Sequence, residues 1–370
     1  MIKINRILIP GLFFIHYLGI GAVAQVIVLI LLLIELFRGK RLSITLADTI
    51  FLYCIALLFV LKLFHVGFGT NLLMLKFYWG FIVFYYYFKL SNYKFDLLLF
   101  FWLTVIITLL DFALINTIVP LEMMKNIPST HAGIISLESK FLFINRSYGL
   151  ASMPTASATI LVALLAGLYI QQRDDFRNYH ILITILPLIC LGSGTGFLLF
   201  LFFVFVRFKL FKGLKFNIGV LFFLLFSYFV TKQSINTDSV FRRLSVDYFD
   251  RLIQLKSEQI TDVLILLDHS LFETLFGLNY TSSMNVRIMS DFGWIDLLEC
   301  YGIFGVFSFI LFLVLKRKLA YLPILIFVIG YFHYPALGTI PGQILFASLL
   351  IFKFNNRNEL ELPTLETNHN

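Results

Sequence analysis

Long apolar stretches follow one another along this chain from Ile7 to Phe354, and short polar gaps separate them. An α-helix needs roughly 20 apolar residues to cross a bilayer, and fewer where the bilayer thins. The pattern therefore predicts an all-α polytopic integral membrane protein with about 12 transmembrane helices. We expect spans near residues 7–19, 21–37, 44–63, 71–88, 96–118, 155–171, 179–192, 196–206, 216–231, 292–315, 319–335 and 340–354.

Two long polar segments interrupt the series, and we expect them to form large extracytoplasmic loops at 119–154 and 232–291. No second domain or internal repeat is visible, so 1–354 is predicted to be a single transmembrane domain. Residues 355–370 are polar and predict a disordered cytoplasmic tail.

Lysine and arginine gather at every second gap between spans. The segments 1–6, 38–43, 89–95, 172–178, 207–215, 316–318 and 353–370 hold 18 of the 29, and the short turns 64–70, 193–195 and 336–339 hold none. Short cytoplasmic loops carry an excess of basic residues, whereas long loops are largely exempt from this rule. The distribution predicts that both termini are cytoplasmic.

The composition supports the membrane class and excludes several others. Only 14% of the residues are charged, against about 25% in a typical soluble domain, and 59% are hydrophobic. The net charge of +8 does not indicate nucleic-acid binding, because most basic residues lie in short loops between spans. The three cysteines show no CxxC spacing, and we expect no metal and no cofactor.

The second long loop carries an amphipathic pattern. Apolar side chains recur at helical spacing at Phe241, Leu244, Tyr248, Leu252 and Leu255. On another face, Arg243, Asp247 and Arg251 are spaced to form a charge ladder. One interpretation is a helix resting on the bilayer surface. The other is an arginine-bearing lid over a site for an anionic headgroup, because the guanidinium binds phosphate oxygens in a bidentate manner.

Charged residues also lie at the predicted outer ends of spans. Arg146 precedes a span that begins near Pro154, where it is either an interfacial anchor or a cation for lipid headgroups. Carboxylates inside spans are costly and are candidate functional groups or partners for cations. We favour a structural pairing for Asp111, whereas Glu299, one turn from Asp296, is placed to share a cavity with the loop arginines. Glu35, Asp48 and Asp96 lie near inner ends and are predicted to be structural.

Several short motifs occur in a recognisable order. They are Arg146-x-x-Gly149, Pro154 with Ala156, Gly192-Ser193-x-Thr195-Gly196, the loop with Arg242, Arg243 and Arg251, Leu275-Phe276-Gly277, Asp291-x-x-Trp294, and Tyr301-Gly302-Ile303-x-Gly305. In this order the chain resembles the Wzy-type O-antigen and capsular polysaccharide polymerases of bacteria, which are themselves similar to the O-antigen ligases. The resemblance runs over most of the chain.

The resemblance implies a GT-C-like fold in the bacterial cytoplasmic (inner) membrane and a metal-independent, inverting glycosyl transfer on its outer face. Donor and acceptor would be glycans linked to undecaprenyl pyrophosphate, and a chain-length regulator is a candidate partner. Four arginines would stabilise the leaving pyrophosphate, namely Arg146, Arg242, Arg243 and Arg251. The base is expected among Asp247, Asp250, Asp291 and Glu299, and the sugar-binding aromatics are Tyr248, Tyr280 and Trp294.

Two other functions stay open. A ligase would share the fold and the arginines, but the histidine expected before the span after the large loop is absent from Arg287 to Phe292. A flippase for lipid-linked glycans would favour internal repeats and polar residues near the midplane. Because no repeat is visible and the large loops lie outside, the polymerase is the preferred hypothesis.

Overall fold

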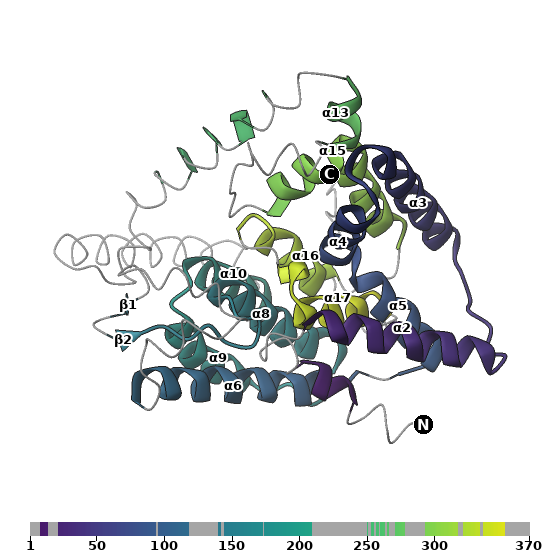
Figure 1. Cartoon of the computed structure of the whole chain (residues 1–370). Helices are drawn as coiled ribbons and strands as arrows, with labels where there is room; N and C mark the ends of the chain where they lie inside the picture. Colours follow the sequence, from purple (N-terminus) through teal and green to yellow (C-terminus); the bar gives the residue numbers. More distant parts are fainter. Residues whose placement is uncertain are drawn as a thin grey trace, which may run out of the picture.

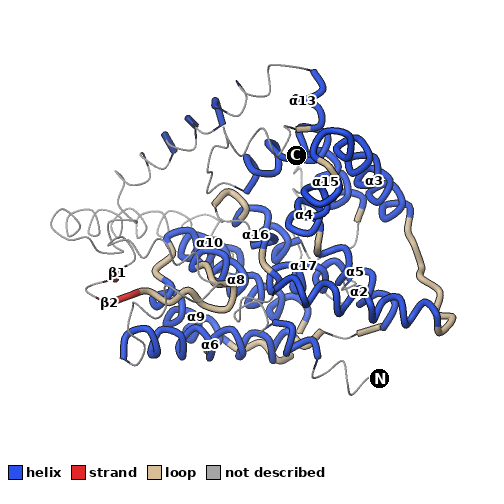
Figure 2. Tube along the Cα trace, viewed as in Figure 1, coloured by secondary structure: helices blue, strands red, loops and turns tan. Residues whose placement is uncertain are grey.

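The described part of the chain consists mainly of α-helices that pack against one another (Figures 1 and 2). The computed structural model describes residues 8–13, 21–93, 95–117, 140–141, 144–172, 174–208, 250, 253–254, 257–258, 260–262, 265, 271–277, 293–316, 321–333 and 336–351. The named helices are α2 (Gly21–Phe37), α3 (Leu46–Val66), α4 (Phe68–Trp79), α5 (Phe81–Ser91), α6 (Leu97–Thr117), α8 (Pro154–Gln171), α9 (Asn178–Leu191), α10 (Gly194–Arg207), α13 (Leu271–Phe276), α15 (Gly293–Leu315), α16 (Tyr321–Gly330) and α17 (Ile340–Ile351). A 3-10 turn, η4 (Ala336–Gly338), precedes α17, and β1 (Lys140–Phe141) pairs antiparallel with β2 (Ile144–Asn145).

The prediction of an α-helical membrane protein is confirmed, and the number of about 12 spans stays a prediction. Within the described residues, four helices are long and apolar enough to cross a membrane: Leu46–Phe64, Leu97–Asn116, Pro154–Gln171 and Gly293–Leu315. Five further apolar helices of 10 to 17 residues accompany them. The predicted span at 216–231 lies outside the described residues, and only 8–13 are described in the first span.

Two predicted spans contain a break in the helix. The span at 71–88 consists of α4 and α5, which meet at Gly80. The carbonyls of Lys76 and Phe77 at this break accept hydrogen bonds from the side-chain amide of Gln343, at 3.2 Å each. The amide of Gln25 donates to Lys76 O and to Gln343 Oε1. Backbone groups freed in an apolar interior need such partners, so the glutamines stabilise the break.

The second break lies in α15, where Gly302 has φ +62° and ψ −167°. Only glycine adopts this conformation readily, since it has no Cβ. The break divides the predicted span at 292–315 into two helical pieces and brings the backbone of α15 against the end of α13.

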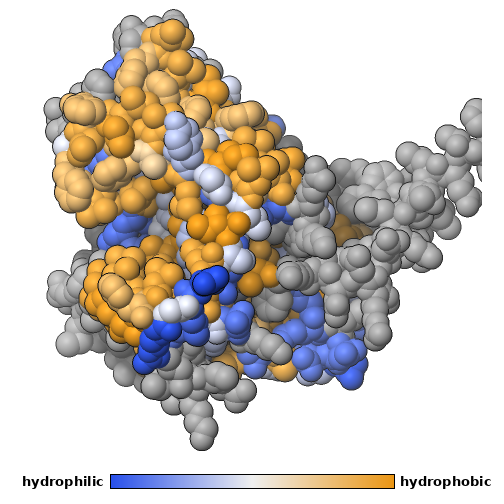
Figure 3. All heavy atoms as spheres, turned by 90° about the vertical axis from the view of Figure 1, so that its right-hand side faces the viewer, coloured by the Kyte–Doolittle hydropathy of each residue, from blue (hydrophilic) through white to orange (hydrophobic). Residues whose placement is uncertain are grey.

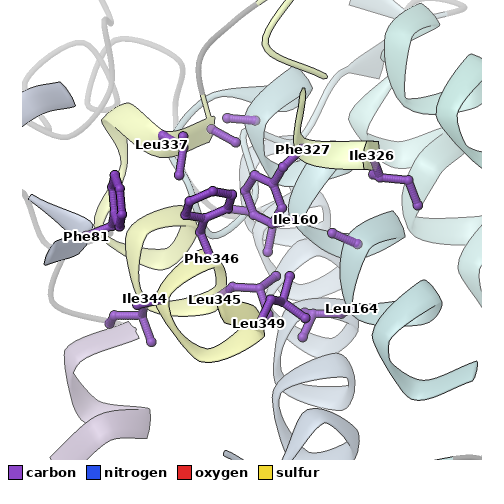
Figure 4. Packing of buried hydrophobic residues seen from close by; sticks show 14 of the residues in the cluster. Phe81, Ile160, Leu164, Ile326, Phe327, Leu337, Ile344, Leu345, Phe346 and Leu349 are labelled. Atoms are coloured by element: carbon purple, nitrogen blue, oxygen red, sulfur yellow. The ribbon is translucent and has the colours of Figure 1, made fainter. Parts of the chain in front are cut away.

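Helix α8 forms the centre of one half of the structure. It packs against α6, α9, α10, α16 and α17, and every residue from Pro154 to Leu168 is buried. Small residues allow this close approach: a Cβ added to Gly196 of α10 would overlap Ala158, and one added to Gly330 of α16 would lie 2.6 Å from Thr159. Figure 4 shows the adjoining core, where side chains of α5, α8, α16, η4 and α17 interdigitate around Phe346.

The other half is built from α5 with α2 and α17, and from α3 with α4, α13 and α15. Helices α2 and α3 expose apolar side chains along their outer faces, among them Val26, Ile30, Leu33, Tyr53 and Phe64. Figure 3 shows the resulting hydrophobic surface, with hydrophilic residues gathered mainly toward its lower end. Exposed apolar area on this scale is typical of contact with lipid.

A buried carboxylate ties three helix ends together at Asp48, in the first turn of α3. Its side chain is fully buried and forms ion pairs with Lys89 near the end of α5 and with Lys316 just after α15. The hydroxyl of Tyr85 and the backbone N–H of Thr45 also donate to it, each at 2.9 Å. Burial lowers the pKa of Lys316, and the bond to Asp48 opposes that shift. The structural role predicted for Asp48 agrees with this geometry.

Asp48→Asn is expected to destabilise the protein, because both lysines lose the charge that compensates them. Removing one partner of a fully buried pair costs about 3–5 kcal/mol, and we expect about 2 kcal/mol here since Lys89 and Lys316 keep some contact with solvent. Thermal unfolding of the purified protein in detergent measures the loss. Asp96→Asn is the control, because Asp96 caps α6 at an exposed position. Equal unfolding midpoints for the two variants would contradict the assigned role of Asp48.

Candidate functional site

The segment that follows Arg146 is held by a buried carboxylate. Asp111 lies late in α6, and its Oδ2 accepts hydrogen bonds from Ser147 Oγ at 2.6 Å, Tyr148 N at 2.8 Å and Gly149 N at 3.0 Å. Asp111 is 2% exposed. Arg146 is half-buried and directly precedes this triplet, after β2, which contacts α6 (Figure 1).

A second set of bonds closes the same turn from α8 and α9. Ser157 Oγ donates to Tyr148 O at 2.8 Å and accepts from Ala151 N at 2.9 Å. Ser147 N donates to Cys190 O, at the end of α9, at 2.9 Å. Gly149 has φ +63°, and a Cβ there would lie 2.8 Å from Ser157. The glycine of the Arg146-x-x-Gly149 motif is therefore required by both its conformation and its packing.

The glycine-rich turn at 192–196 lies beside this segment and forms a tight hairpin. Gly192 ends α9 in the left-handed conformation, and Ser193 caps α10 by accepting from Gly196 N at 3.2 Å. Ser193 Oγ also donates to Thr155 Oγ1 at 3.2 Å. The N-terminal ends of α8 and α10 thus meet near Arg146, and both helix dipoles direct partial positive charge toward this region.

Two more of the sequence motifs meet at the break in α15. A Cβ added to Gly277, after α13, would lie about 2.5 Å from the backbone of Cys300 and Tyr301, and one added to Gly302 would lie 2.5 Å from Leu275. Gly277 has φ +85°. Leu275-Phe276-Gly277 and Tyr301-Gly302 are thus in backbone contact, which holds this part of the second long loop against α15.

Glu299 and Asp296 lie in the first half of α15 and are 1% and 5% exposed. Lys62, near the end of α3, is 2% exposed, interacts electrostatically with Glu299, and lies 5.6 Å from the centre of the Tyr301 ring. A buried cation thus lies near Glu299, and a direct ion pair between the two stays a prediction. The role of Glu299 as a base stays a prediction, and its enclosure means that an acceptor hydroxyl needs a path to it.

Trp294 has a packing role in this structure. Its indole N–H donates to Val328 O of α16 at 3.1 Å. The centre of its ring lies 5.2 Å from the ring centre of Tyr331 and 6.0 Å from that of Phe309. Stacking of Trp294 on a sugar stays a prediction.

Most of the predicted site residues lie outside the described residues. These are Arg242, Arg243, Asp247, Tyr248, Arg251, Tyr280 and Asp291. The amphipathic stripe and charge ladder of the second long loop therefore stay predictions. Among the candidates that the structure describes, Arg146 lies in the turn held by Asp111, and Glu299 belongs to the separate group around Lys62.

Sequence reasoning missed the partners that hold the site. The structural pairing of Asp111 with a cation stays a prediction, and the sequence did not indicate that its Oδ2 accepts hydrogen bonds from Ser147 Oγ and from two backbone N–H groups. Ser157 was not singled out. Within the described part of the chain, no three His, Cys, Asp or Glu side chains are grouped to hold a metal ion. Comparison with models of protein families, with curated proteins and with solved structures found no match to this chain.

Proposed function

We propose that this protein is a polysaccharide polymerase that joins oligosaccharide repeat units linked to undecaprenyl pyrophosphate. The reaction takes place on the outer face of the bacterial cytoplasmic membrane, in a GT-C-like bundle of about 12 spans with both termini cytoplasmic. The observation that carries the proposal is the juxtaposition of three motifs distant in sequence: Arg146-x-x-Gly149, the start of α8, and the glycine-rich hairpin.

Further contacts agree with the proposed orientation. Asp48 follows the basic segment 38–43 in the chain and pairs with Lys89 of segment 89–95 and with Lys316 of segment 316–318. All three segments are predicted to be cytoplasmic because of their basic residues. Asp48 lies at the start of α3 and Lys62 near its end, so the enclosed Lys62–Glu299 group belongs to the opposite side in this topology.

The proposed chemistry needs charge stabilisation and one proton acceptor. A hydroxyl at the non-reducing end of a new repeat unit attacks the anomeric carbon of the growing chain with inversion. The bond from that carbon to the pyrophosphate breaks, the hydroxyl proton passes to a carboxylate, and undecaprenyl pyrophosphate leaves. Arginines stabilise the negative charge that develops on the leaving group, and a positioned turn such as 146–149 keeps the guanidinium in place before the reaction begins.

Deletion of the gene in the native host, followed by gel separation of the surface glycan, tests the proposal. We expect the long ladder to collapse to one repeat unit on its acceptor, because ligation and flipping continue. Lipid-linked polymer that accumulates outside without reaching the acceptor would identify a ligase. Lipid-linked single units that accumulate inside would identify a flippase.

A further inference from the structure

The side chain of Asp111 organises the backbone that directly follows Arg146. Its Oδ2 takes one hydroxyl and two backbone N–H groups from three consecutive residues, 147–149. A carboxylate that accepts several N–H bonds fixes a turn tightly, because charge-assisted hydrogen bonds are about twice as strong as neutral ones.

We infer that Asp111 is a positioning residue for Arg146, which sets where the guanidinium stands when it meets the pyrophosphate of the lipid-linked substrate. This inference rests on the proposed function for its substrate. Its structural basis is that Asp111 of α6, Ser157 of α8 and the Cys190 carbonyl of α9 all form hydrogen bonds to the turn.

The bonds to the turn account for the presence of a carboxylate in an apolar helix. Asp111 lies in a span of high hydropathy, where an ionisable residue is costly. Ser147 and Ser157 are fully buried, so the turn they close is enclosed by protein. Replacement of Asp111 leaves buried N–H groups of Tyr148 and Gly149 without this acceptor, and the turn must rearrange to satisfy them.

Asp111→Ala and Asp111→Asn test the effect on activity. With lipid-linked repeat units as substrate, we expect Asp111→Ala to lower the rate on the order of a hundredfold, as displacement of a reacting group by 1 Å does. Asp111→Asn keeps a neutral acceptor and should recover part of the rate. Thr104→Val is the matched control on the same helix, because the Thr104 hydroxyl donates to Phe100 O, one turn earlier in α6.

A double-mutant cycle separates positioning from a general structural loss. In an Arg146→Lys background, Asp111→Asn is expected to cause little further loss, since it acts through the residue already replaced. Losses that multiply in the double variant would overturn the inference, because independent effects add in free energy.

A labelling measurement tests the same inference without relying on enzymatic activity. Arg146→Cys is made in a chain whose three native cysteines are replaced by alanine, and a membrane-impermeant maleimide is applied to intact cells. We expect Asp111→Asn to change the labelling rate of the introduced thiol several-fold, and Thr104→Val to leave it unchanged. Equal rates in all three backgrounds would overturn the positioning role. If labelling responds to Asp111 but the wild-type protein forms no polymer, the proposed function fails while the structural link stands.

Discussion

Arg146→Ala is expected to abolish polymer formation while the protein still inserts into the membrane. A single preset donor to a developing negative charge contributes on the order of a hundredfold or more to the rate, because it acts where water is excluded. Arg146 follows β2 and precedes the turn that Asp111, Ser157 and Cys190 hold in place, so its backbone is ordered before substrate binds. The measurement is the length distribution of the surface glycan in cells that carry only the variant.

Arg146→Lys should recover little activity. Lysine keeps the charge but lacks the planar fork that binds two phosphate oxygens at once. Arg242→Ala and Arg251→Ala are expected to give the same loss, if these loop arginines contribute to the same clamp.

Arg38→Ala is the matched control. Arg38 pairs with Glu35 at the end of α2, and its side chain is 56% exposed. It lies in the segment 38–43, which the sequence predicts to be cytoplasmic. We expect normal polymer from this variant. Normal polymer from the alanine variants of Arg146, Arg242 and Arg251 would remove the pyrophosphate clamp from the mechanism.

Gly302→Ala is expected to destabilise the fold more than any other single substitution considered. The residue holds φ +62° with ψ −167°, and an added Cβ would lie 2.5 Å from the carbonyl of Leu275. Backbone strain of this kind costs about 1–3 kcal/mol, and overpacking about 1–3 kcal/mol more. Because the blocking atoms belong to backbone, no side-chain rotation relieves the overlap. We therefore expect a loss of about 2–6 kcal/mol.

The thermal unfolding midpoint in detergent measures this loss, and the amount of protein in the membrane gives a second reading where the variant does not fold. Gly69→Ala is the control. Gly69 lies in α4 at an ordinary φ, and an added Cβ there would meet no atom within 4 Å. This variant should be as stable as the parent or slightly more stable, since alanine favours a helix. A Gly302→Ala protein that unfolds at the parental temperature would contradict the backbone contact between α13 and α15.

The helices were predictable because hydropathy alone marks them. Expected spans at 44–63, 155–171 and 179–192 correspond to α3, α8 and α9 within three residues at each end. The membrane environment imposes this regularity, since any lipid-exposed stretch must be both apolar and internally hydrogen-bonded. The breaks were harder to see: Gly80 and Gly302 lie in apolar runs, and only the partners that approach them reveal why the helix stops.

The contacts of the site could not be predicted for a different reason. Asp111 and Ser147 are 36 residues apart, and Gln25 and Gln343 are 318 apart. A single sequence shows that a buried polar residue needs a partner, but it does not show which residue is that partner. The motifs that suggested a function were detectable because they are short and local, whereas the side chains that hold them come from distant helices.

Reconstitution is the most direct test of the central hypothesis. The purified full-length protein is placed in liposomes with undecaprenyl-pyrophosphate-linked repeat units and EDTA, and lipid-linked glycan is followed with released undecaprenyl pyrophosphate. The proposed function predicts a growing ladder, with one undecaprenyl pyrophosphate released for each new glycosidic bond. Repeat units that stay single, or that cross the bilayer without forming a new bond, would contradict it.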